Sequence, residues 1–245
     1  MTELWSVLLI LAGASLIRGA TGFGDALFAM PLLAFVMPVR HAAPLMAMTA
    51  LWIAFLILRT EWRAVEFRSA WQLILFGLMG IPFGVWGVRY LDEQLVKRAL
   101  GAFVVCFSAW SLYRPEGLHL KSSRSAPAFG FCAGLLGGAY NTSGPPLVLY
   151  GTMRRWPVDS FRAALQAYGI FSSIGILTAH GIAGNITTDV FRLFVFGVIP
   201  VTLAVVMGKR LTQAVSPKRF GQIVYGLLIV IGLGLVFASA DTTGG

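Results

Sequence analysis

The sequence predicts an all-α polytopic membrane protein built from two inverted repeats. Of its 245 residues, 57% are hydrophobic and 12% are charged, with a mean hydropathy of +0.78, whereas roughly 25% of residues are charged in soluble domains. The apolar chain turns polar and glycine-rich at two matching places, GATGFGDALFAMPLL from Gly19 and GLLGGAYNTSGPPLVL from Gly134. Hydrocarbon tolerates irregular backbone only where protein or a water-filled cavity covers it. Two such breaks in corresponding halves indicate a shared central site.

Charged residues bound two sets of apolar segments. The first set covers residues 4–20, 25–37, 42–58, 69–88 and 99–113, and the second covers residues 126–137, 142–153, 163–180, 193–208 and 220–239. A charged stretch separates the two sets. We therefore expect a first transmembrane repeat at 1–113, a linker loop at 114–125 and a second transmembrane repeat at 126–245.

The two halves match each other at an offset of roughly 115–120 residues, as expected of an internal repeat. Four matches occur in the same order: Pro31-Leu32-Leu33 with Pro146-Leu147-Val148, Gly19 and Gly22 with Gly134 and Gly137, Ile81-Pro82 with Ile199-Pro200, and Lys97-Arg98 with Lys218-Arg219. One match between glycine-rich apolar segments could arise by chance. Four in the same order indicate duplication.

The topology depends on the first two segments of each half, which are shorter than the ~20 residues that a perpendicular span needs. They form either short spans or one broken helix, which gives 8–10 crossings in all. With ten crossings, the 19 Lys and Arg residues divide into thirteen on one face and five on the other, with Arg18 in the membrane. Single broken crossings give eleven and seven. Because cytoplasmic loops carry the excess of Lys and Arg, ten crossings with both termini outside fit better, and an odd number per half makes the repeats inverted.

The chemistry of the predicted site lies at the two breaks. Gly19, Gly22 and Gly24 let the first segment leave helical geometry, and the second break ends in two prolines that favour a new helix start. A helix N-terminus inside the membrane suits an oxyanion. The expected substrate-binding residues are Thr21, Gly22, Gly24, Asn141, Thr142, Ser143 and Gly144. The alternative is that the small residues merely allow close helix packing.

Arg18 and Asp25 are ionisable residues inside the predicted membrane region, and such residues are treated as functional by default. Their seven-residue spacing lets them pair or face one polar cavity, with Arg18 attracting an anion and Asp25 relaying a proton or neutralising Arg18. A structural ion pair and an arginine that reaches one interface are the alternatives. A coupling role requires Asp25 to be protonated for part of the cycle. Gln166, Tyr168 and Ser173 are secondary candidates on the apolar segment after the second break.

Several function classes find no support in the sequence. The net charge of +9 comes mainly from short loops, where it sets orientation, so a nucleic-acid partner is not expected. Cys106 and Cys132 lie in apolar stretches and are expected to be free, buried thiols. His41, His119 and His180 are far apart, which predicts no metal or haem site and no cofactor. No nucleophile–base motif appears, so the chain is not expected to be an enzyme.

The two motifs resemble the TauE/SafE sulfite exporter family, also called the toluene sulfonate uptake permeases. The resemblance rests on TGFGDALFAMPLL from Thr21, GLLGGAYNTSGPPLVLYGTMRRWP from Gly134 and FRAALQAY from Phe161, and it extends over essentially the whole chain. It implies transport of sulfite, sulfonates or thiosulfate across the bacterial cytoplasmic (inner) membrane, often as export. Asp25 departs from the pattern, because relatives commonly carry an apolar or aromatic residue there, so its role is not transferred from the family.

Together these features predict a secondary transporter that exports a small sulfur-containing oxyanion by alternating access. Proton coupling and a homodimer stay open, and membrane lipids are the remaining expected partners. An anion channel would use the same donors without coupling flux to protons. An intramembrane enzyme or redox anchor is a weaker alternative, because it would need a ligand set or a nucleophile.

Overall fold

Helices and short connections, with no strand, make up the part of the chain that the computed structural model describes, residues 2–22, 24–61, 67–113, 120, 123–211 and 217–238. This confirms the predicted all-α class. The helices are α1 (Thr2–Thr21), α2 (Asp25–Val36), α3 (Val39–Glu61), α4 (Phe67–Tyr90), α5 (Glu93–Tyr113), the 3-10 turn η2 (Ser123–Ser125), α6 (Ala126–Tyr140), α7 (Gly144–Met153), α8 (Val158–Ile182), α9 (Thr188–Leu211) and α10 (Pro217–Ala238).

The helices have the length and surface of a polytopic membrane protein. Helices α3, α4, α5 and α9 each contain a segment that is long and apolar enough to cross a membrane. Helices α1, α2 and α10 contain shorter apolar segments. Large apolar side chains such as Trp71, Phe83, Trp86, Phe196 and Ile199 are more than half exposed. Such an apolar surface is favourable next to lipid.

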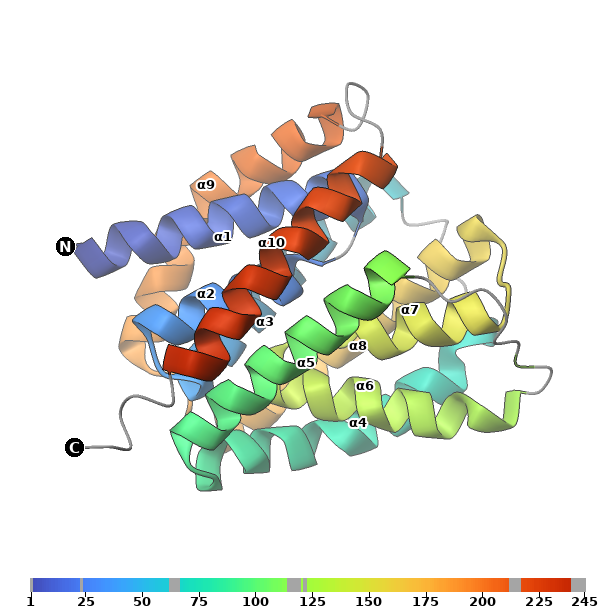
Figure 1. Ribbon diagram of the computed structural model, residues 1–245, viewed down its shortest axis with the longest axis horizontal. Coiled ribbons are helices and arrows are strands. Elements are labelled where there is room, and N and C mark those ends of the chain that lie inside the picture. Colours follow the sequence, from blue (N-terminus) through green and yellow to red (C-terminus); the bar gives the residue numbers. More distant parts are fainter. Residues whose placement is uncertain are drawn as a thin grey trace.

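The short segments form two helical hairpins, α1–α2 and α6–α7. Helix α1 ends at Thr21 and α2 begins at Asp25, while α6 ends at Tyr140 and α7 begins at Gly144. Figure 1 shows that the two hairpins enter the molecule from opposite sides, with both turns in its interior. Each hairpin returns to the side on which it started, so its two segments do not form one broken crossing.

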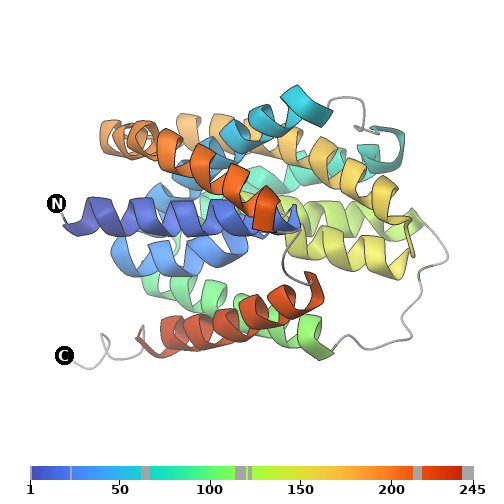
Figure 2. The same cartoon turned by 90° about the horizontal axis from the view of Figure 1, so that it is seen from above.

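Corresponding helices of the two halves run in opposite directions. In Figures 1 and 2, α1 and α5 run from left to right, whereas α6 and α10 run from right to left. Helix α1 begins and α10 ends on the same side of the molecule. The architecture is therefore that of inverted repeats. The repeat boundaries stay a prediction, because within 114–125 only Leu120 and Ser123–Ser125 are described.

The two halves interlock through close helix pairs. Helix α1 packs along α9 and α6 packs along α4, and these are equivalent pairs if α6 repeats α1 and α9 repeats α4. At both contacts glycine allows backbone to touch backbone: a Cβ on Gly19 would collide with the Val205 carbonyl, and one on Gly134 with the Gly77 carbonyl. Close approach through small residues is the usual way in which helices associate in lipid. Gly19 and Gly134 are thus helical packing residues rather than parts of the breaks.

Helices α5 and α10 form a separate pair on one side of the hairpins (Figure 2). They approach closely where Gly101 of α5 meets the backbone of Gly232 in α10. On the opposite side of the hairpins lie α3, α8 and α9. The hairpin turns are therefore enclosed between two layers of longer helices, which removes them from lipid.

Candidate functional site

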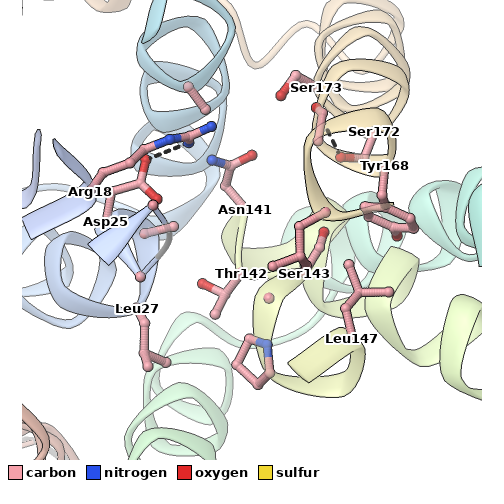
Figure 3. A pocket seen from close by; sticks show the side chains of 18 of the residues that line it. Arg18, Asp25, Leu27, Asn141, Thr142, Ser143, Leu147, Tyr168, Ser172 and Ser173 are labelled. Atoms are coloured by element: carbon pink, nitrogen blue, oxygen red, sulfur yellow. Dashed lines mark hydrogen bonds and ion pairs between the residues drawn. The ribbon is translucent and has the colours of Figure 1, made fainter. Parts of the chain in front are cut away.

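A polar cavity of about 100 Å³ lies where the two hairpin turns meet. Its walls come from the α1–α2 turn, the α6–α7 turn and the middle of α8, with single residues from α3 and α5 (Figure 3). A cavity of this size holds a small ion, whereas drug-sized ligands occupy about 300–1,000 Å³. The predicted residues that line it are Arg18, Gly22, Gly24, Asp25, Asn141, Thr142, Ser143, Gly144, Gln166, Tyr168 and Ser173.

The first turn depends on two glycines in left-handed backbone geometry. Gly22 has φ 84° and Gly24 has φ 93°, values that cost an L-residue about 1–2 kcal/mol. The Gly22 N–H still donates to the Arg18 carbonyl at 2.7 Å, and the Phe28 N–H donates to the Gly24 carbonyl at 3.1 Å. The chain thus unwinds over only a few residues before α2 begins. Thr21 is the last residue of α1, but its side chain lies outside the described part of the chain.

An ion pair crosses this first turn. Arg18 Nη1 donates to Asp25 Oδ2 at 2.8 Å, and the side chains are only 11% and 8% exposed. Both side chains line the cavity. The ion pair and the shared polar cavity, which the sequence offered as alternatives, are therefore both present. Arg18 does not reach for an interface. Its Nε, however, is buried without a hydrogen-bond partner.

The second turn is built from polar side chains instead of glycines. Asn141 takes the left-handed conformation, with φ 52°, and its N–H donates to the Gly137 carbonyl at 2.7 Å. Asparagine tolerates this geometry better than most residues. The Thr142 hydroxyl donates to the Tyr140 carbonyl at 2.8 Å. In Figure 3 the Asn141 side chain extends into the space between the Arg18–Asp25 pair and α8.

Helix α7 begins at this turn with few free amides. Ser143 precedes it and makes no side-chain capping bond, and Pro145 and Pro146 occupy its first turn. Because proline has no N–H, Gly144 is the one N–H donor among the first three residues of the helix. The positive end of the helix dipole remains, but side chains must supply most of the donors at this end of the cavity.

The third wall comes from α8. Gln166, Tyr168 and Ser173 line the cavity as predicted, and Ser172 joins them. Tyr168 is 2% exposed, and its hydroxyl is buried without a hydrogen-bond partner. A Cβ on Gly77 would collide with the Tyr168 ring, so α4 makes room for the tyrosine by carrying glycine. Sequence reasoning missed Ala50 of α3 and Phe107 of α5, which also line the cavity. Apolar residues in apolar helices give no signal of their own.

The described residues contain no cluster of three or more His, Cys, Asp or Glu side chains that could hold a metal ion. His180 is fully buried, with Nε2 2.9 Å from the Gly138 carbonyl oxygen and Nδ1 2.9 Å from Asn185 Nδ2, so it ties α8 to α6. His119 lies outside the described residues. Cys106 and Cys132 are free, as predicted, but they are exposed. The prediction that they are buried is wrong, because an apolar stretch facing lipid looks the same in sequence as one facing the core.

Two opposed helical hairpins that meet at a polar cavity with a buried ion pair are typical of membrane transport proteins. Residues 7–235 match the family described as sulfite exporter TauE/SafE. The chain therefore belongs to the TauE/SafE sulfite exporter family, a family of membrane transporters.

One curated relative has a more specific name. The chain is 24% identical over 234 residues to the "Probable sulfite/organosulfonate exporter TauE" of Cupriavidus necator, covering 93% of this chain and 91% of the relative. No solved structure shows significant similarity to the chain.

Proposed function

We propose that this chain exports a small sulfur-containing oxyanion, of the sulfite, sulfonate or thiosulfate class, across the bacterial cytoplasmic membrane by alternating access. The name of the Cupriavidus relative supports the substrate class. The inverted repeats and the two hairpin turns around one cavity support the mode of transport.

The observation that carries the proposal is the unsatisfied arginine donor of a cavity residue. Arg18 Nε is buried without a hydrogen-bond partner, and on the opposite wall of the cavity the Tyr168 hydroxyl lies beside Ser143 and against Gly77 of α4 (Figure 3). A buried polar group that lacks a partner costs about 1–3 kcal/mol. A ligand with several acceptor oxygens and no need for acceptors would satisfy Arg18 and offer an acceptor to the Tyr168 hydroxyl, and a deprotonated oxyanion is such a ligand.

The Arg18–Asp25 pair supplies a route for coupling to protons. While Asp25 is ionised it neutralises Arg18 at 2.8 Å, so an incoming anion meets little net attraction from the arginine. Protonation of Asp25 releases the positive charge of Arg18 to the anion. In the proposed cycle one proton and one anion therefore bind at the same pair and cross together, so the outward anion gradient drives export and an inward proton gradient opposes it.

Flux into proteoliposomes tests the substrate and the donors. Sulfite, thiosulfate and sulfoacetate are compared with carboxylates, and Tyr168→Phe is compared with the matched control Tyr90→Phe, whose ring is 64% exposed. Loss of one hydrogen bond to a charged ligand is worth about 1.5–3 kcal/mol, so Tyr168→Phe should weaken apparent affinity by about tenfold or more while the control transports normally. Equal flux in the two variants would remove Tyr168 from the binding site.

Proton coupling is tested separately with Asp25→Asn. The neutral amide keeps the shape of Asp25 but carries no titrating group, so the variant should move anion down its gradient without driving accumulation by a pH gradient. A wild-type protein that never accumulates substrate against its gradient would instead indicate an anion channel.

A further inference from the structure

The two hairpins differ in how they contact the α5–α10 pair. Helix α2 packs against both α5 and α10. Its counterpart α7 packs against α6 and α8, but over the described residues it has at most marginal contact with α5 or α10. The α5–α10 pair touches the remainder of the molecule mainly through α2. In an arrangement with twofold pseudosymmetry, the α5–α10 pair would contact α2 and α7 equally. Here the pair lies closer to α2 than to α7.

An apolar groove lies on the side where α7 is left uncovered. It has a volume of about 370 Å³ and is walled by Phe103 and Phe107 of α5, by α6 from Ala128 to Leu136, and by Pro145, Pro146 and Leu149 of α7. Phe107 and Pro145 also line the polar cavity. The groove thus runs from the wall of the cavity to the first turn of α6, at the end of the molecule where α5 finishes and α6 begins.

The equivalent space on the other side is filled. Met30 and Leu33 of α2, Leu100 of α5, and Leu228 and Leu235 of α10 share one core cluster and are at most 1% exposed. By contrast, the core cluster around α7, which includes Leu147 and Tyr150, contains no residue of α5 or α10 among the described side chains. Over the described side chains, the same pair of helices therefore covers α2 and leaves α7 uncovered, although Tyr140 at the end of α6 donates to the Val96 carbonyl of α5 at 3.0 Å.

We propose that the α5–α10 pair is the moving gate of the transporter and that Phe107 is its gating residue at the cavity. In the conformation described here the pair closes on α2 and opens the groove beside α7. In the alternate conformation it closes on α7, with Phe107 sealing the cavity against Pro145, and withdraws from α2. The inference rests on the proposed transport by alternating access.

The packing makes such a swing feasible. The close contact of Gly101 with Gly232 holds α5 and α10 together, so they can move as one body. The α5–α10 pair would meet apolar side chains whether it packs on α2 or on α7. In lipid, one set of van der Waals contacts can replace another with little net cost in free energy. The α1–α9 and α4–α6 pairs, whose backbones touch through glycine, form the fixed frame.

Distances between spin labels in lipid nanodiscs test the gate. All variants carry Cys106→Ser and Cys132→Ser. One pair, Leu112→Cys on α5 with Thr152→Cys on α7, reports on the open side. A second pair, Val36→Cys on α2 with Phe237→Cys on α10, reports on the closed side, and Met79→Cys with Leu135→Cys serves as a control across the fixed α4–α6 contact. Distances are recorded at neutral and acidic pH, with and without sulfite or thiosulfate.

The expected result is a reciprocal change: the α5–α7 distance shortens as the α2–α10 distance lengthens, while the α4–α6 distance stays constant. If the protein transports anion but neither reporter distance changes under any condition, the gate is overturned. The groove would then be a static site for lipid or for an organic tail. A protein that transports none of the anions, yet shows the reciprocal change, would overturn the proposed substrate and retain the gate. Absence of both transport and distance change would overturn both proposals.

Discussion

The two hairpins occupy equivalent positions in their repeats but bring different chemistry to the cavity. The α1–α2 turn is made of glycine and carries the buried Arg18–Asp25 pair. The α6–α7 turn is made of Asn141, Thr142 and Ser143, which carry no charge. Helices α5 and α10 also pack against α2 of the first hairpin, whereas over the described residues they have at most marginal contact with α7 of the second.

Under the proposed mechanism this difference separates two tasks. The charged pair of the first hairpin would couple transport to protons. The neutral donors of the second hairpin would orient an anion without binding it so strongly that it cannot leave.

The largest effect is expected from breaking the ion pair. Arg18→Gln leaves the Asp25 carboxylate buried without a cation, and removal of one partner of a buried pair costs about 3–5 kcal/mol. Transport should fall to background and thermal stability in detergent should drop. The double variant Arg18→Gln with Asp25→Asn should regain most of the stability but no transport. Normal flux in the single variant would contradict a role for Arg18 in anion binding.

A smaller effect should distinguish the backbones of the two turns. Gly24→Ala meets no steric obstacle, since nothing lies within 4 Å of the added Cβ, but its φ of +93° is unfavourable for alanine. The variant should lose about 1–2 kcal/mol of stability. Asn141→Gly keeps a residue that accepts φ 52° and should fold well while losing the amide.

Thermal stability and flux of these two variants, measured together, check the prediction. Gly24→Ala should lower both, whereas Asn141→Gly should lower flux alone. Gly226→Ala in α10, which also has free space around the added Cβ and no positive φ, is the matched control and should change neither. A Gly24→Ala protein as stable as the control would show that the turn can rearrange.

The sequence could predict the breaks, the Arg18–Asp25 pair and most of the cavity, because polar groups are tolerated at few positions within the hydrocarbon of a membrane. A glycine-rich or Asn-Thr-Ser stretch inside an apolar run must be buried in protein, and its repetition places two such stretches together. Near-helical spacing made Gln166, Tyr168 and Ser173 secondary candidates, and they line the cavity as well.

The remaining features depend on which apolar face meets protein and which meets lipid, and periodicity carries no such signal in a helix that is apolar all round. For this reason the sequence did not indicate Phe107 as a cavity residue or Cys132 as exposed. It also could not separate Gly19, which packs against α9, from Gly22, which unwinds the chain. The closer packing of α5 and α10 on α2 is a property of one conformation, and no local sequence pattern encodes it.

The smallest effects should separate two adjacent hydroxyls of the second turn. A hydroxyl has a single hydrogen to donate, and that of Thr142 goes to the Tyr140 carbonyl at 2.8 Å, so Thr142 has none left for an anion. Ser143 lies beside the Tyr168 hydroxyl, lines the cavity and makes no capping bond to α7, so we expect its hydroxyl to donate to a bound anion. Thr142→Val should therefore lower stability by about 1 kcal/mol with an affinity within about twofold of wild type.

Ser143→Ala should do the reverse, with unchanged stability and an affinity for the transported anion weakened by about fivefold, close to the ~1 kcal/mol of one hydrogen bond. Thermal unfolding and concentration-dependent flux on the same preparations measure both quantities. If Thr142→Val weakens affinity more than Ser143→Ala does, the Thr142 hydroxyl must turn from the Tyr140 carbonyl to the anion during transport, and the second turn would then be a moving part of the site rather than a fixed set of donors.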